Sequence, residues 1–172
     1  MYMRTSDPSI YAAGDSVEVA NLVTDRVAVY NLYELKRPLK GVVPVYITVI
    51  GDKALGSAGI RESIALKEGF KTLSAKLGLP DKHPLKMPGT GKMFVKVIVE
   101  KNTGRLLSVE SYGATRAVYA LVTLASNLIY QKAMLEDLLF VHQASHPHSN
   151  PQPPAHPLVN AVLKLYSMLC NQ

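Results

Sequence analysis

Residues 92–112 constrain the fold most, because they have the pattern of two antiparallel strands joined by a tight turn. Every second residue of 92–100 is apolar, which is the period of a strand with one buried face; these are Met93, Val95, Val97 and Val99. Residues 101–104 supply turn chemistry, and residues 105–112 alternate again. The sequence therefore predicts a β-hairpin whose apolar face other elements must cover.

Segments with helical spacing provide that cover. Residues 115–133 repeat apolar side chains at i, i+3, i+4 and i+7, namely Val118, Leu121, Val122, Ala125, Leu128 and Ile129. Residues 158–169 have similar spacing, 134–141 favour a short helix, and 60–68 favour a helix of about two turns. These elements indicate an α+β fold, an antiparallel sheet of about three to five strands with helices packed mainly on one side.

The first half of the chain gives less regular patterns. Residues 41–50 have the β-branched and aromatic composition of a strand, and Pro44 suits a strand start or an edge. Residues 70–77 fit an extension of the preceding helix, but we favour a break at Gly69, since glycine inside a helix costs about 1 kcal/mol. Residues 78–91 contain three prolines and predict a surface loop.

Composition and charge exclude several classes of function. The chain has 48% hydrophobic and 19% charged residues, enough for one folded domain with a short additional segment. Its 19 Lys and Arg against 13 Asp and Glu give a formal net charge of +6, but the basic residues are scattered. We therefore expect no nucleic-acid partner. Cys170 is the only cysteine, which excludes an intrachain disulfide and a Cys-rich zinc site.

No segment indicates a membrane partner or a metal. The sequence has no apolar core of signal-peptide length and no run of about eighteen apolar residues, so a cytoplasmic location is the expectation. The Pro-rich tract 142–157 holds four histidines, His142, His146, His148 and His156. Its spacing does not converge ligands, so we expect solvated or locally bonded histidines. Residues 89–92 lack the upstream glycine of a phosphate loop and predict a turn.

Four motifs carry a resemblance to a known family. Residues 5–15, T-S-D-P-S-I-Y-A-A-G-D, resemble the late flavin-binding motif T-x-x-P-x-I-Y-A-x-G-D of flavoproteins with two dinucleotide folds. Residues 59–69 and 95–107 are similar to the first helix and the hairpin of their interface domain, although Ser108 replaces the usual glycine, and residues 136–138 are similar to a later D-L ending. The chain thus resembles the carboxy-terminal dimerisation domain of FAD-dependent pyridine nucleotide-disulfide oxidoreductases, a family that includes NADH oxidases, coenzyme A-disulfide reductases and lipoamide dehydrogenases.

The resemblance implies roles for two residues and a division of the chain. Gly14 would let the backbone approach FAD, and Asp15 would accept a hydrogen bond from a ribityl hydroxyl. Residues 1–40 would be the remnant of the FAD-binding domain and its linker, and residues 41–172 the interface domain. Residues 17–40 look shorter and less typical than in the family. In the parent enzyme, FAD is the cofactor and NAD(P)H the co-substrate.

The parts that perform the chemistry are absent from the sequence. There is no G-x-G-x-x-G turn for FAD or NAD(P)H, and Cys170 is not placed as a redox thiol. His146 lies in H-P-H-S-N where lipoamide dehydrogenase-like members have a catalytic H-P-T-x-S-E, and Asn150 lacks the carboxylate that would orient an imidazole. Residues 156–161 instead resemble the D-P-x-N-x-A ending of the NADH oxidase branch. We assign no catalytic residue and expect the isolated chain to hold no FAD tightly and to be inactive.

Two hypotheses for function remain. The first is a dimerisation domain, as a fragment or a truncated member of a flavin-dependent NAD(P)H oxidoreductase that acts on disulfides or oxygen. Such a domain would form a homodimer through an isologous contact. The alternative is a free-standing protein-binding module that retains the fold and docks on another protein or on a separate flavoprotein chain.

Overall fold

The computed structural model describes residues 5–7, 9, 10, 12, 19–23, 26–28, 41–82, 87–142, 144, 146–149 and 155–170. The chain divides into two compact units, Met1–Pro44 and Val45–Gln172. In the smaller unit, strands β1 (Val19–Asn21) and β2 (Arg26–Ala28) pair antiparallel. The larger unit contains the sheet and the helices that the sequence predicts.

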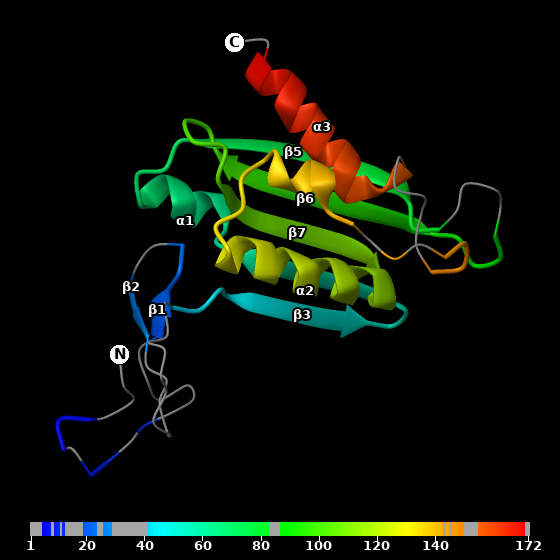
Figure 1. Cartoon of the computed structure of the whole chain (residues 1–172). Coiled ribbons are helices and arrows are strands. Elements are labelled where there is room, and N and C mark those ends of the chain that lie inside the picture. The colour runs from blue at the N-terminus through cyan, green and yellow to red at the C-terminus, as the bar shows by residue number, and fades with distance from the viewer. Residues whose placement is uncertain are drawn as a thin grey trace. The chain divides into compact units, whose positions relative to one another are not determined.

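Five strands of the larger unit form one antiparallel sheet (Figure 1). They are β3 (Val45–Ile50), β4 (Lys53–Gly59), β5 (Thr72–Pro80), β6 (Lys92–Glu100) and β7 (Leu106–Ala114). Their spatial order is β3-β4-β7-β6-β5, so β3 and β5 are the edges. The predicted hairpin is confirmed as the pair β6 and β7, with a register shift near Val99.

Two helices cover one face of this sheet. Helix α2 (Thr115–Tyr130) packs on β4 and β7, and α3 (Pro157–Cys170) packs on β5 and β6 (Figure 1). Helix α1 (Glu62–Lys67) and the 3₁₀ helix η2 (Asp137–Phe140) are short. The predicted α+β fold, an antiparallel sheet with its helices mainly on one side, is confirmed. In the described part of the chain, no helix has the length and apolar character needed to cross a membrane.

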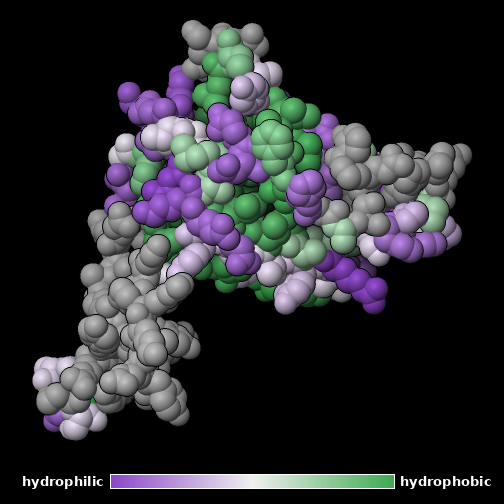
Figure 2. Space-filling model, viewed as in Figure 1, coloured by the Kyte–Doolittle hydropathy of each residue, from purple (hydrophilic) through white to green (hydrophobic). Residues whose placement is uncertain are grey.

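The core lies between the sheet and these two helices. The alternating residues of β6, under α3, and the apolar stripe of α2, over β4 and β7, are both buried there. These residues are Met93, Val95, Val97 and Val99 of β6 and Val118, Leu121, Val122, Ala125 and Ile129 of α2. Each of these Val, Leu, Ile and Met side chains stabilises the fold by about 1.5–3 kcal/mol when it leaves water. Figure 2 has the same view as Figure 1 and shows apolar surface that remains visible between hydrophilic residues on the helix-covered face.

Strands β4 and β5 differ from the sequence expectation. Residues 72–80 form β5, so residues 70–77 do not extend the preceding helix, and the loop predicted to begin at residue 78 begins at Asp81. Pairing with β6 along the whole length of β5 decides this. The pattern K-A-L-G-S-A-G does not predict β4, because it lacks β-branched and aromatic residues.

The small residues of β4 are needed because α2 lies directly on that strand. A Cβ atom at Gly56 would lie 2.9 Å from a methyl carbon of Val118 and 2.9 Å from a methyl carbon of Val122. Side-chain carbons do not approach so closely without a shift of the helix or the strand. The absence of a side chain at Gly56 thus sets how close α2 comes to the sheet.

We predict that Gly56→Val lowers the free energy of unfolding by about 1–3 kcal/mol, because the added side chain overpacks the contact with α2. Urea denaturation followed by circular dichroism measures the change. Leu55→Val, on the next residue of β4, is the matched control, because Leu55 is exposed and points to the opposite face. That variant should change stability by less than about 0.5 kcal/mol. Equal effects of the two substitutions would contradict the proposed close contact.

Candidate functional site

The sheet face that α2 and α3 leave uncovered, called here the open face, carries a row of large side chains. Leu55, Tyr112 and Phe94 lie side by side on β4, β7 and β6. The ring centroids of Phe94 and Tyr112 are 6.3 Å apart, and Nζ of Lys76 lies 5.9 Å from the Phe94 centroid. These residues line a shallow groove of about 330 Å³. Glu110 also lines the groove, so charges of both signs flank a surface that can contact an apolar group.

A salt bridge bounds one end of the open face. Nζ of Lys96 donates to Oε2 of Glu62 at 2.6 Å, and the Thr72 hydroxyl donates to Oε1 of Glu62 at 3.3 Å. These hydrogen bonds, that of Lys96 first, hold the pKa of the Glu62 carboxyl below its ordinary value. Because both partners are partly exposed, the pair contributes little to stability. Its effect is to fix α1 against β6.

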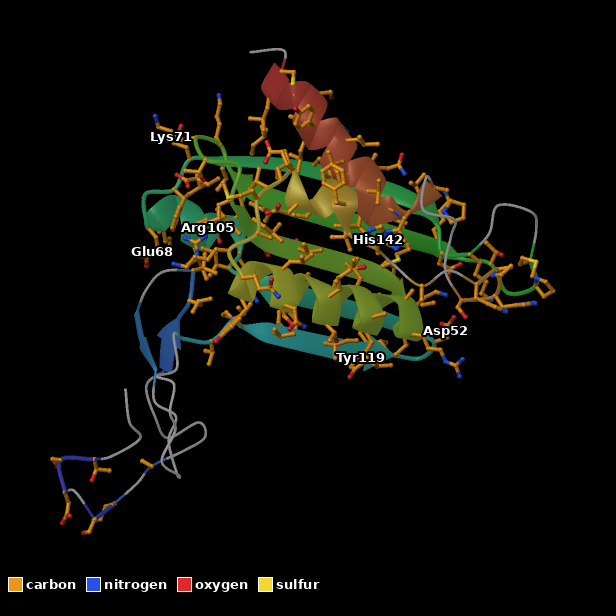
Figure 3. The ribbon with its side chains drawn as sticks, viewed as in Figure 1. Asp52, Glu68, Lys71, Arg105, Tyr119 and His142 are labelled. Carbon is orange, nitrogen blue, oxygen red and sulfur yellow. The ribbon has the colours of Figure 1, made fainter. Side chains whose placement is uncertain are left out.

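A second hollow, of about 740 Å³, lies at the end of the sheet where α2 begins. Asp52, in the turn between β3 and β4, and His142, in the segment after η2, line it (Figure 3). Arg116 in the first turn of α2 lines it too. Asp81 is buried there, and its Oδ1 accepts the N–H of Gly91 at 2.7 Å. Charged groups of both signs thus line this hollow together with apolar residues of α2.

The predicted histidines occupy two different environments. His146 and His148 are exposed and stack with centroids 5.8 Å apart, and Nδ1 of His146 accepts the N–H of His148 at 3.3 Å. His156 is buried, and its Nδ1 accepts the N–H of Leu158 at 3.2 Å in the first turn of α3. Burial lowers the pKa of His156 to about 4. Among the described residues, no group of three His, Cys, Asp or Glu side chains converges for a metal.

The amino-terminal motif is described only in part. The Asp7 carboxylate accepts hydrogen bonds from the Ser9 hydroxyl at 2.6 Å and the Ser9 N–H at 2.9 Å, which hold the pKa of Asp7 below its ordinary value. The N–H of Thr5 donates to the carbonyl of Ile10 at 2.9 Å. Gly14 and Asp15, the predicted flavin contacts, lie outside the described residues, as does Asn150.

Comparison with known proteins identifies the relatives of the chain. No family model matches it. The chain is 30% identical over 156 residues to the NAD(P)H sulfur oxidoreductase (CoA-dependent) of Pyrococcus abyssi, which covers 80% of the chain and 35% of the relative. It is 27% identical to an NADH oxidase of Enterococcus faecalis over 86% of the chain and 36% of the oxidase.

Solved structures give the same result for the fold. The NAD-dependent persulfide reductase from A. fulgidus matches 99% of this chain with a TM-score of 0.86 and 25% identity, over 34% of its own length. The chain is homologous to the FAD-dependent pyridine nucleotide-disulfide oxidoreductases. The resemblance inferred from the sequence is thereby confirmed. The chain spans about a third of the length of these oxidoreductases.

The sequence does not predict several features of the candidate site. The open-face row combines residues from three strands, and the Glu62–Lys96 bridge spans helix and sheet. The sequence groups His156 with the solvated or locally bonded histidines, yet the structure buries it at the start of α3. Its one local signal is Pro157, since proline favours the first position of a helix and leaves the preceding residue to cap it.

Acid should destabilise the protein through His156. Its pKa is about 4 in the folded chain against 6.5 ordinarily, so the unfolded chain binds more protons between these values. Stability from the neutral imidazole is fully present above pH 6.5 and falls by about 1.4 kcal/mol per pH unit toward pH 4. Urea denaturation across this range measures the slope. In His156→Asn, which retains a capping acceptor, the slope should flatten, whereas the exposed-site control His148→Asn should keep it. A wild-type slope in His156→Asn would refute the assignment.

Proposed function

We propose that the chain is the dimerisation domain of a flavin-dependent NAD(P)H oxidoreductase, as a fragment or a truncated member. The main support is the match of 99% of the chain to about a third of the persulfide reductase, with a TM-score of 0.86. The sequence has no dinucleotide-binding glycine turn, and its single cysteine is an exposed residue at the end of α3. A domain of this kind contributes association to an enzyme rather than electron transfer.

The cofactors belong in this proposal to the parent enzyme. The relatives are named as NAD(P)H sulfur oxidoreductases, a persulfide reductase and NADH oxidases, which favours a parent that passes electrons from NAD(P)H through FAD to a sulfur substrate or oxygen. Residues 1–40 would complete the flavin site of that parent, with Gly14 and Asp15 beside FAD. Residues 41–172 would form the interface domain.

The open-face groove favours a second function, that of a free-standing binding module. Leu55 and Tyr112 are exposed there beside Phe94, and Lys76 and Lys96 flank them. Glu110 also lines the groove and Lys96 is paired with Glu62, so the apolar row itself suits a peptide that carries aromatic residues. In this alternative the partner would be another protein or a separate flavoprotein chain.

The purified chain should be a colourless homodimer that does not oxidise NADH or NADPH. Size-exclusion chromatography with light scattering gives the mass, the visible spectrum reports flavin, and loss of nicotinamide absorbance reports activity. Stoichiometric flavin would show that the amino-terminal half-site is sufficient for binding, and turnover of NAD(P)H would contradict a role limited to association. A colourless monomer would favour the binding module.

FAD added at high concentration tests the proposed flavin contacts. Any residual binding, measured by quenching of flavin fluorescence, should weaken about tenfold in Asp15→Asn, because a charge-assisted hydrogen bond contributes about 1.5–3 kcal/mol. Asp7→Asn is the matched control, since Asp7 lies in the same motif and bonds only locally to Ser9 in the described structure. Equal affinities of the two variants would remove Asp15 from the proposed site.

A further inference from the structure

In the described part of the larger unit, strand β3 is an edge of the sheet and has apolar side chains on both faces. Ile47 lies opposite Gly56, so Val45, Ile47 and Val49 share the helix-covered side of the sheet, yet they remain 47, 37 and 53% exposed. Tyr46 and Ile50 on the open face are 46 and 76% exposed. β3 carries no charged residue, although proteins commonly protect an edge strand with charges. The edge is therefore built to be covered.

The flank of α2 beside β3 extends this surface without adding a charged residue. Residues 117, 120 and 124 of α2 line the hollow on one side of the helix, and helical geometry places Tyr119 and Tyr130 on the other side. Figure 3 shows Tyr119 next to β3. Tyr119 and Tyr130 are 63 and 44% exposed. The surface formed by β3 and this flank of α2 is thus uncharged along its length, with Thr123 and Ser126 between the two tyrosines.

The same surface is free of charge in a chain that is otherwise strongly basic. Residues 41–51 and 117–131 contain no Lys, Arg, Asp, Glu or His, whereas the chain as a whole carries a formal net charge of +6. Two copies of a basic protein repel each other wherever their cations meet. They can approach without that cost at this surface, which favours a second copy as its occupant.

We propose that β3 pairs antiparallel with β3 of a second copy about a two-fold axis and joins the two sheets into one of ten strands. The inference rests on the proposed dimerisation function and names the surface that performs it. Each α2 would then lie on the same side of the joined sheet, and Val45, Ile47 and Val49 of both copies would be buried between the two helices. The residues of the contact are self-complementary, as an isologous interface requires.

The backbone of β3 specifies the register of this pairing. Ile50 and Lys53 close a two-residue turn and form a hydrogen-bonded pair. Hydrogen-bonded and non-hydrogen-bonded pairs alternate along an antiparallel ladder, so the backbone groups of Ile50, Thr48 and Tyr46 bond to β4. The N–H and C=O groups of Val45, Ile47 and Val49 consequently point to the free edge. Residues directly opposite each other share a face, so the axis passes through a residue pair. When Ile47 lies opposite Ile47 of the partner subunit, the outward N–H and C=O groups of Val45, Ile47 and Val49 can all form hydrogen bonds across the axis.

Ile47→Lys tests the contact by placing two cations at the axis. The dissociation constant of the dimer, measured by sedimentation equilibrium or by light scattering over a concentration series, should rise about 100-fold or more. Leu163→Lys is the matched control, because Leu163 is 49% exposed on α3, which packs on β5 and β6 at the opposite edge of the sheet. It should leave the dissociation constant within about threefold of the wild-type value. Circular dichroism checks that both variants fold.

Cross-linking gives a second test of the contact, which does not depend on whether Ile47→Lys folds. In a Cys170→Ser background, Ile47→Cys should form an intersubunit disulfide on mild oxidation, since a hydrogen-bonded antiparallel pair brings Cα atoms to about 5.5 Å. Leu163→Cys in the same background should not cross-link at a comparable rate. Thr48→Cys reports a register moved by one position, and rapid cross-linking there would still support the β3 contact.

The outcomes separate this inference from the function on which it rests. A wild-type dimer that Ile47→Lys dissociates, or that cross-links through residue 47 or 48, supports both. A dimer that Ile47→Lys leaves intact and that neither cysteine cross-links keeps the dimerisation function and overturns the β3 contact. A wild-type chain that stays monomeric at all concentrations refutes the dimerisation function and the contact together.

Discussion

The seating of α2 on β4 is the contact on which the rest of the larger unit depends. Gly56 leaves the helix and the strand in direct contact, and Val118 and Val122 fill the place that a side chain would occupy. With α2 fixed there, the buried stripe of the helix closes the core over β4 and β7. The same seating leaves β3 beyond the helix, at the edge of the sheet. The close contact of α2 with β4 therefore determines both the buried core and the exposed edge at β3.

The fold was predictable where its signals are local. The alternation along β6 and β7 and the helical spacing of α2 and α3 repeat within a few residues, so the sequence alone predicts them. Strand β4 has no such signal, because its small residues make room for α2, a helix that follows much later in the chain. Strand β5 contains Gly78 and Pro80, which favour a loop, and only its pairing with β6 fixes it as a strand.

The candidate sites divide in the same way. The flavin motif at residues 5–15 and the helix at residues 59–69 are contiguous patterns, which is why they point to the oxidoreductase family without a structure. The row of Leu55, Tyr112 and Phe94 brings together three strands, and no spacing in the chain predicts that register. The sequence predicts a solvated or locally bonded His156, and the local bond to Leu158 is present, but its burial depends on what packs around it in space.

The strand order also has a consequence for how the sheet assembles. The pairs β3–β4, β5–β6 and β6–β7 each join strands that are consecutive in the chain, whereas β4–β7 pairs residue 59 with residue 108. Closing a long loop costs more conformational entropy than closing a hairpin. The sheet therefore consists of two locally formed pieces joined at one seam, and that seam makes the largest contribution of these pairs to the contact order that slows folding. Helix α2, which packs on both strands of the seam, is the element that holds the two pieces together.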